Sequence, residues 1–375
     1  MKPRRLLRCM VLLAWLLLLS ACLWRRPVQV GFAGELSGRE SDLGIGSRNG
    51  VLLAAEQINA AGGIDGHPIE IIVKDDAGKP DVARQVDQEL VDAGVVAIIG
   101  HSTTSQTIAG LEVTQPAGIV MLSPSASSQS LTGIDDLFFR VCADNTLDVI
   151  ALANHIYAGG QHTLAIIYDA DNDAYARRYA EGVQMEFERL GGKITRIEAI
   201  SADAILDAED VLDIVLPDKP EAILVVASAV NTAVIIQRAQ LLDSTAAFYG
   251  SDWAYSDAFL QAGGRAIEGV ELAAAFDIQS PRQQMQDFKA LYLERFGFAP
   301  NFTAGQAYEA MMVLAHALEQ TGGSADGLPE ALLDIQDFEG LSSTISLNQY
   351  GDVVRPAFLF QVDDGEFVLI GVFEP

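Results

Sequence analysis

Residues 95–105 have the sequence VVAIIGHSTTS, in which an apolar run leads directly into a polar segment. The run from Val95 to Gly100 has the continuous apolar character of a strand covered on both faces in a parallel sheet. The polar residues stand before a helix expected over 105–115. Because a strand that feeds a helix is the repeating unit of doubly wound sheets, this segment predicts the α/β fold class.

The same alternation extends outward from this segment and then starts a second time. In the first unit we expect strands over 28–33, 69–73, 95–100 and 119–122, and helices over 50–61, 81–93 and 105–115. The second unit, over about 143–270, is expected to hold strands over 163–168, 194–199, 222–227 and 246–249, and helices over 147–157, 175–190, 205–215 and 230–242. The pattern therefore predicts two doubly wound parallel sheets.

The tail of the chain has a different pattern. It predicts two successive helices, 281–296 and 304–320, followed by strands over 343–347, 357–362 and 366–373. No low-complexity linker separates the two α/β units. We therefore expect two lobes joined by short crossings, not independent domains on a flexible tether.

The composition is that of a globular protein with an acidic surface. The chain has 375 residues, of which 50% are hydrophobic, and its formal net charge is -27. Negative charge on this scale repels nucleic acid and anionic headgroups, so we expect no nucleic-acid partner. Solubility alone would also account for such a charge.

The first residues resemble an export signal. An apolar run over 10–19, too short to span a bilayer comfortably, is followed by LSAC at 19–22. The run is preceded by the basic residues Lys2, Arg4, Arg5 and Arg8. LSAC resembles the bacterial lipobox, which predicts a signal peptide over 1–21 and a lipid on the thiol of Cys22. A plain secretory signal with a chance cysteine and a membrane-spanning anchor are the alternatives.

One further cysteine, Cys142, would remain in the mature chain after that cleavage. It ends the apolar, strand-like run 138–142. A reactive thiol needs exposure and cationic neighbours, and the sequence shows neither clearly. We expect Cys142 to be a buried structural residue.

Five segments, taken in order and spacing, resemble one family: the periplasmic amino-acid-binding proteins of branched-chain amino-acid ABC transporters. The segments are GFAGELSG (31–38), AAEQINAAGGIDG (54–66), VKDD (73–76), IIGHSTTS (98–105) and SPSAS (123–127). None is specific alone. The resemblance implies a type I periplasmic binding protein of the Venus-flytrap form, with two lobes, a ligand cleft between them and closure by hinge motion.

The resemblance also implies three crossings between the lobes. They are expected near 140–145, 271–277 and 345–350. The first lobe would then comprise residues 22–142 and 275–346, and the second residues 143–274 and 347–375.

The first lobe is expected to bind the carboxylate of a free amino acid. Residues 100–105 lie at a strand-to-helix junction, where unpaired N–H groups and the helix dipole favour an anion. The hydroxyls of Thr104 and Ser105 could add donors there. The resemblance assigns a carboxylate contact to Thr104, a second hydroxyl contact to Ser127 and an ammonium contact to the carbonyl of Ser125. A helix cap is the alternative role for Thr104.

The second lobe is expected to bind the ammonium group. The resemblance places the family's ammonium-binding acid at Asp252, after a strand over 246–249, and a tyrosine that closes over the ligand at Tyr175. A turn or cap aspartate and a half-buried tyrosine at a helix start are the alternatives. The sequence departs from the family at Leu43, where an aromatic residue is common, and at Ser228, which replaces a tyrosine.

These departures predict a changed side-chain pocket. Trp253 and Tyr255 are candidates to fill the space. The α-amino-acid clamp is expected to remain, but the ligand need not be leucine, isoleucine or valine.

Signatures of catalysis are weak. The sequence has no phosphate-loop string and no nucleophile elbow, and its histidines lack metal-ligand spacing, so we expect no cofactor, no metal and no enzyme activity. His101 is interpreted as a residue that shapes the binding loop. The adjacent Asp75 and Asp76 are interpreted as turn and solvated-edge residues.

The expected function is that of an exported, lipid-anchored, monomeric binding protein. It would capture an amino acid or similar small molecule and deliver it to an ABC permease in the membrane. The alternatives are a sensing module that signals to a membrane partner and, less favoured, an enzyme on a similar two-lobed scaffold.

Overall fold

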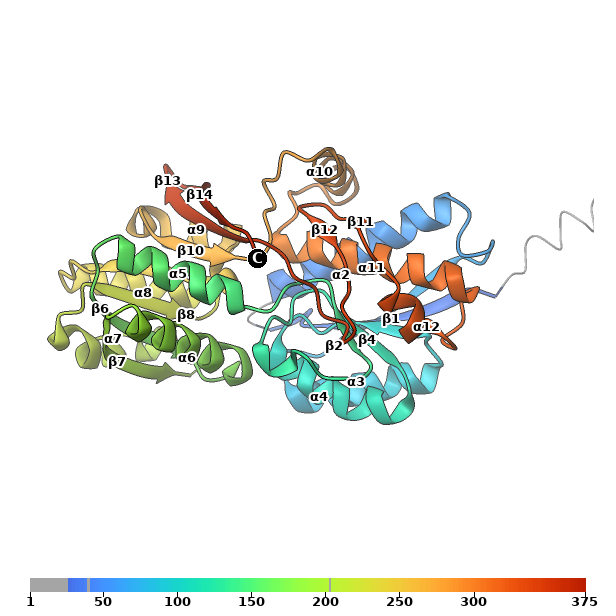
Figure 1. Ribbon diagram of the computed structural model, residues 1–375, viewed down its shortest axis with the longest axis horizontal. Helices are drawn as coiled ribbons and strands as arrows, with labels where there is room; N and C mark the ends of the chain where they lie inside the picture. The colour runs from blue at the N-terminus through green and yellow to red at the C-terminus, as the bar shows by residue number, and fades with distance from the viewer. Residues whose placement is uncertain (1–25, 39–40, 202–203) are drawn as a thin grey trace, which may run out of the picture.

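The computed structural model describes residues 26–38, 41–201 and 204–375, and it divides them between two α/β lobes (Figure 1). The predicted signal peptide and Cys22 lie outside the described residues. Within the described ranges, no helix combines the length and apolar character needed to cross a bilayer.

The first lobe is built on a sheet of five parallel strands in the order β2-β1-β3-β4-β5. The strands are β1 Val28–Gly34, β2 Ile69–Asp75, β3 Ala97–Ile99, β4 Val120–Ser123 and β5 Phe138–Arg140. One face packs against helices α2 (Ser41–Ala60) and α11 (Phe302–Thr321), and the other against α3 (Pro80–Ala93) and α4 (Thr104–Ala117). The predicted doubly wound lobe is confirmed.

Helix α2 begins at Ser41, well before the predicted start at residue 50. Its first turns contain glycines, which lower intrinsic helix propensity and misled the interpretation of the sequence. The structure gives these glycines a packing role. A Cβ on Gly44 would lie 1.8 Å from the carbonyl oxygen of Glu35, and one on Gly50 would lie 2.1 Å from that of Ala304. Glycine therefore lets α2 approach the exit of β1 and helix α11.

The second lobe is built on a sheet of seven strands in the order β14-β13-β10-β9-β8-β6-β7. The strands are β6 Thr163–Asp169, β7 Lys193–Ile200, β8 Ala222–Val226, β9 Ala247–Gly250, β10 Glu271–Ala274, β13 Ala357–Asp363 and β14 Glu366–Phe373. The helices are α5 Thr146–Ala158, α6 Asp173–Arg189, α7 Ala204–Val215, α8 Ala229–Leu241 and α9 Asp257–Gly263. Helix α5 packs beside α6, and α8 packs beside α7 and α9.

The sequence had predicted a wholly parallel second sheet, but this sheet is mixed. Strands β13 and β14 are antiparallel, and β13 is antiparallel to β10. The reason is local. Asp364 and Gly365 join β13 to β14 with φ values of 51° and 77°, the backbone of a tight hairpin turn whose strands must run in opposite directions.

The chain passes between the lobes three times, in agreement with the predicted fold class. It leaves the first lobe after β5 and returns after β10 to α10 (Gln283–Phe296), α11 and α12 (Leu328–Leu333). A short hairpin of β11 (Phe338–Glu339) and β12 (Thr344–Ile345) then precedes the last passage to β13. Strand β10 lies inside the range predicted for the second crossing, so that passage begins after Ala274.

A single buried side chain, Arg355, contacts all three passages. It belongs to the last one, and its Nη1 donates to the carbonyl of Val141 in the first at 3.0 Å. Its guanidinium lies 5.5 Å from the ring centroid of Phe276 in the second. Its Nη1 also lies 2.6 Å from Oε2 of Glu309 on α11.

The predicted burial of Cys142 is confirmed, and burial raises the pKa of its thiol to about 12.

Candidate functional site

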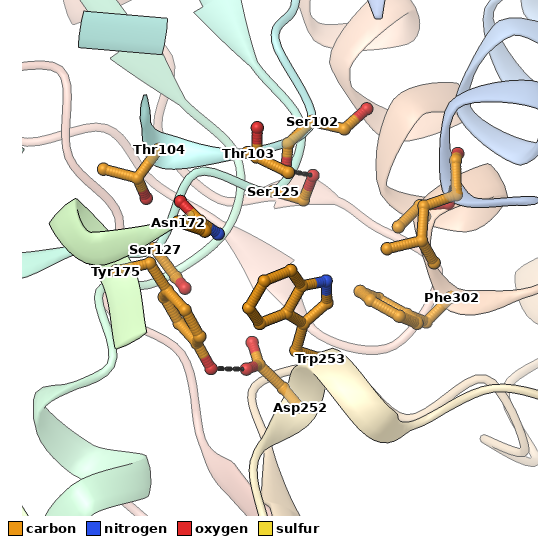
Figure 2. A pocket seen from close by; sticks show the side chains of 12 residues that line it. Ser102, Thr103, Thr104, Ser125, Ser127, Asn172, Tyr175, Asp252, Trp253 and Phe302 are labelled. Carbon is orange, nitrogen blue, oxygen red and sulfur yellow. Dashed lines mark hydrogen bonds between the residues drawn. The ribbon is translucent and has the colours of Figure 1, made fainter. Parts of the chain in front are cut away.

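A cavity lies where the two lobes meet (Figure 2). It is lined by Leu43, Ser102, Thr103, Thr104, Ser125, Ser127, Asn172, Tyr175, Asp252, Trp253, Phe302 and Thr303. Most of these residues follow the carboxyl ends of parallel strands: β3 and β4 in the first lobe, and β6 and β9 in the second. Open α/β sheets bind ligands at such edges.

In the first lobe, Thr104 opens helix α4 and is 1% exposed. Its hydroxyl oxygen has no hydrogen-bond partner among the described residues. The N-cap of α4 is Thr103, so the alternative interpretation of Thr104 as the cap is wrong. Helix N-termini offer unpaired N–H groups, and Thr104 adds a donor beside them.

The next loop supplies Ser125 and Ser127 to the same wall of the cavity. The hydroxyl of Ser125 donates to the carbonyl of Ser102 at 2.8 Å, which ties the two loops together. Ser127 is 4% exposed, and its carbonyl accepts from the N–H of Asn145 at 2.8 Å. Both residues are thus part of the cavity wall that the sequence indicated.

In the second lobe, the hydroxyl of Tyr175 donates to Oδ1 of Asp252, as Figure 2 shows. Burial of the Asp252 carboxyl raises its pKa to about 6 and outweighs the opposing effect of the bond from Tyr175. Burial, and then the charge of Asp252, also raise the pKa of Asp148 well above its ordinary value. An incompletely compensated carboxylate at the wall of a cavity is suited to a cation.

Trp253 lines the cavity, whereas Tyr255 does not. The indole of Trp253 meets the ring of Tyr175 edge to face, with centroids 5.7 Å apart. Tyr255 instead stacks on Phe360 at 4.4 Å, inside the second lobe. The interpretation of Tyr255 as a pocket residue is therefore wrong, and Trp253 alone takes that place. Ser228 caps helix α8 by accepting from the N–H of Asn231 and is not part of the lining.

Ser105, like Tyr255, lies outside the lining. Its hydroxyl donates to Oδ1 of Asn172 at 3.1 Å, across the gap between the lobes. The hydroxyl of Ser128 makes a second bond across the gap, to the carbonyl of Ala174 at 2.7 Å. Ser105 thus joins the first lobe to the start of α6.

Several lining residues were not singled out from the sequence. Ser102 and Thr103 stand in a string that was quoted, but no role was assigned to them or to Asn172. Phe302 and Thr303 start α11, far along the chain from the other loops. No local signal pointed to these two, since only the packing of α11 against α2 brings them to the cavity.

A buried ionic triad stabilises the loop between β3 and α4, which is the first binding loop. Nδ1 of His101 lies 2.6 Å from Oδ2 of Asp76, and Nε2 lies 3.1 Å from Oδ2 of Asp87. Burial alone would lower the pKa of His101, but the charges of Asp87 and Asp76 outweigh it and raise the pKa to about 10. The imidazole is therefore protonated at neutral pH.

This triad corrects one interpretation and supports another. Asp76 is 1% exposed, so it is a buried ion-pair partner and not a solvated-edge residue. His101 shapes the loop as expected, because its carbonyl also accepts from the hydroxyl of Ser123 at 2.8 Å. Residues 102–104, which carry the donors, are thus held in place by the buried bonds of His101.

Two α/β lobes, three connecting passages and a polar, aromatic cavity between them define a two-lobed ligand-binding protein with the type I periplasmic binding fold. Residues 27–366 match the family model described as periplasmic binding protein, and the chain belongs to that family.

Individual relatives are similar over most of their length. A leucine-, isoleucine-, valine-, threonine- and alanine-binding protein of Pseudomonas aeruginosa is 25% identical over 332 residues, 87% of each chain. The structure of a branched-chain amino acid transporter substrate-binding protein from Streptococcus pneumoniae, in complex with isoleucine, matches with a TM-score of 0.86 at 23% identity. It covers 93% of this chain and all of that one.

A more distant match has a different ligand. The structure of a solute-binding protein of an ABC transporter from R. palustris, in complex with benzoate, has a TM-score of 0.84 at 17% identity. It covers 93% of this chain and 97% of that one. At these identities the solved structures establish the shared fold.

Proposed function

We propose that this protein is an extracytoplasmic solute-binding protein that captures an amino acid or a similar small zwitterion and delivers it to an ABC permease. One observation carries the proposal. The cavity has the start of α4 on one lobe, with the hydroxyl of Thr104 unpartnered among the described residues, and the carboxylate of Asp252 on the other. A zwitterion matches that separation of donor and acceptor, since its two charged ends need opposite partners.

The assignment of the carboxylate end rests on the start of α4. The positive end of the helix dipole and the hydroxyl of Thr104, which has no partner among the described residues, both favour an anion. The hydroxyl of Ser127, 4% exposed and on the same wall, is the second proposed contact, and the carbonyl of Ser125 is the proposed acceptor for the ammonium.

The assignment of the ammonium end rests on Asp252. A bound ammonium would lower the pKa of this carboxyl from about 6 and stabilise its charged form. Tyr175, 4% exposed, would orient Asp252 and close over the ligand, while Trp253 would contact the ligand side chain.

The setting of this function is also proposed. The basic, apolar and LSAC segments at the N-terminus support export, cleavage after residue 21 and lipidation of Cys22. We propose a monomer with lobes comprising residues 22–142 with 275–346, and 143–274 with 347–375. The names of the similar proteins support amino acids as the ligand class and ABC transport as the context.

Differential scanning fluorimetry tests the proposal with matched ligands. Each amino acid is compared with its des-amino acid and its decarboxylated amine, for example leucine with 4-methylpentanoate and 3-methylbutylamine. We expect only zwitterions to raise the melting temperature, because a ligand stabilises the state that binds it. Stabilisation by 4-methylpentanoate or benzoate that equals the effect of every amino acid would contradict the role of Asp252.

A further inference from the structure

The indole N–H of Trp253 is an unpaired donor inside the cavity. The side chain is 6% exposed and lines the cavity, yet Nε1 has no hydrogen-bond acceptor among the residues the structure describes. Buried donors in folded proteins nearly always have a partner, and leaving one unpaired costs about 1 to 3 kcal/mol. A partner for this N–H is therefore expected in the molecule that occupies the cavity.

Trp253 is held so that its nitrogen faces the part of the cavity away from the proposed carboxylate contacts. Figure 2 shows the indole between Tyr175 and Phe302, with its nitrogen directed towards Phe302 and with Thr104 on the opposite side. The edge-to-face contact with Tyr175, at 5.7 Å and 88°, fixes the ring plane. The donor is thus directed at the ligand side chain and not at its α-carboxylate.

The nearby hydroxyl groups donate to protein atoms. The hydroxyl of Thr303 donates to the carbonyl of Leu43 at 2.9 Å, and that of Ser102 donates to the hydroxyl of Ser47 at 3.3 Å. The remaining surface at this end is the apolar side chains of Leu43 and Phe302. This part of the cavity therefore combines hydrocarbon walls with an indole N–H that has no acceptor in the described part of the chain.

We propose that the ligand is an amino acid whose side chain carries a neutral oxygen acceptor, a hydroxyl or a carboxamide, which accepts the indole N–H of Trp253. This inference rests on the proposed function and narrows its ligand class. A hydrocarbon side chain would leave the donor buried and unpaired. A side-chain carboxylate is disfavoured because one neutral donor would not offset the cost of burying its charge.

Isothermal titration calorimetry with near-isosteric pairs tests this directly. The pairs are valine and threonine, leucine and asparagine, and methionine and glutamine. We expect the polar member to bind about tenfold more tightly in at least one pair. In Trp253→Phe, which keeps an aromatic ring and removes the N–H, that preference should fall by about tenfold.

A second measurement uses the wild-type protein and so does not depend on the folding of the variant. The indole ¹H–¹⁵N resonance of Trp253, assigned by its loss in Trp253→Phe or by residue-selective labelling, should move downfield with the polar ligand and not with its apolar counterpart. An unchanged proton shift with both ligands would overturn the hydrogen bond.

The remaining outcomes separate this inference from the function on which it rests. Tighter binding of the hydrocarbon member in every pair would overturn the inference and leave an amino-acid-binding protein. A polar preference that is equally strong in Trp253→Phe would overturn the role of Trp253. Absence of binding by all six amino acids would overturn both the inference and the amino-acid assignment.

Discussion

Nη1 of Arg355 lies 2.6 Å from Oε2 of Glu309, and both side chains are almost completely buried where the three passages between the lobes meet. Removing one partner of such a pair leaves an uncompensated buried charge. We expect Arg355→Met to lower the free energy of unfolding by about 3 to 5 kcal/mol in urea titrations.

The surface pair Arg282–Glu339 provides the control. Its atoms are as close, at 2.5 Å, but its side chains are 33% and 67% exposed. Arg282→Met should cost less than about 1 kcal/mol. Equal losses of unfolding free energy in the two variants would show that burial of the pair at the passages does not increase its contribution to stability.

The His101 triad predicts a specific pH dependence. The folded-state pKa of about 10 lies above the ordinary value of 6.5, so the contribution of His101 to stability is fully present below about 6.5. It is lost progressively as the pH rises through 10. The unfolding free energy of the wild type should therefore decrease between these limits relative to that of His101→Gln.

The partly exposed pair of His155 and Glu271 is the comparison for this experiment, with Nε2 and Oε2 2.8 Å apart. The pKa of His155 is also raised, but solvent screening weakens the effect of Glu271 on it. His155→Gln should therefore alter the pH profile of stability less than His101→Gln does. Parallel profiles for the wild type and His101→Gln would rule out a charged triad.

Asp252→Asn should affect binding and stability in opposite directions. Loss of the charge should weaken amino-acid binding by about 1 to 3 kcal/mol, measured by calorimetry. The raised pKa means that the folded state bears the cost of a buried carboxylate above about pH 6 and is relieved of it as the pH falls towards 3.8. The ligand-free variant should therefore melt at a higher temperature than the wild type at pH 8.

The exposed Asp257, five residues further on, supplies the control variant Asp257→Asn. It should leave both quantities unchanged. Unaltered affinity in Asp252→Asn would remove this carboxylate from the site.

Thr104→Val should reduce ligand affinity about tenfold while leaving the melting temperature of the free protein unchanged or higher. The reason is that its hydroxyl has no partner among the described residues, so the fold loses no hydrogen bond. Thr114 is matched to it: it lies on the same helix, is fully buried and has a hydroxyl without a described partner, but it is absent from the cavity lining. A loss of affinity in Thr114→Val as large as that in Thr104→Val would assign the effect to packing.

Cys22→Ser should convert a membrane-retained protein into a soluble or unprocessed one, as judged by detergent phase partitioning and by the mass of the N-terminal peptide. Cys142→Ser, at the other cysteine of the mature chain, should retain the membrane association. The lipid anchor would be refuted by identical partitioning of Cys22→Ser and the wild type.

The strands and most of the cavity wall could be predicted because their signals are local. Thr104, Ser127 and Asp252 each follow a buried apolar strand, and the carboxyl edges of parallel strands converge in space. The strand pattern therefore indicated where such loops lie, and the resemblance to the periplasmic amino-acid-binding proteins selected these three residues within them. The glycines of α2 lowered the helical signal at its start, and the close approaches of Gly44 to the exit of β1 and of Gly50 to α11 explain them.

The remaining site features depend on contacts between distant segments. Phe302 reaches the cavity through the packing of α11, and Asn172 meets Ser105 only when the lobes adjoin. His101, Asp76 and Asp87 come from three separate segments, so adjacent aspartates were interpreted as solvated when one of them is buried. Charge in a sequence does not reveal which carboxylates the fold encloses.

The buried ionic triad that holds residues 102–104 in place has a kinetic consequence. Because His101, Asp76 and Asp87 hold that loop through bonds that involve no ligand, an incoming solute encounters a finished half-site on the first lobe. Association then needs no loop ordering and should proceed near the rate of diffusive encounter. Residence time would depend on how long the second lobe keeps Tyr175 and Asp252 in place, so changes there should alter release more than capture.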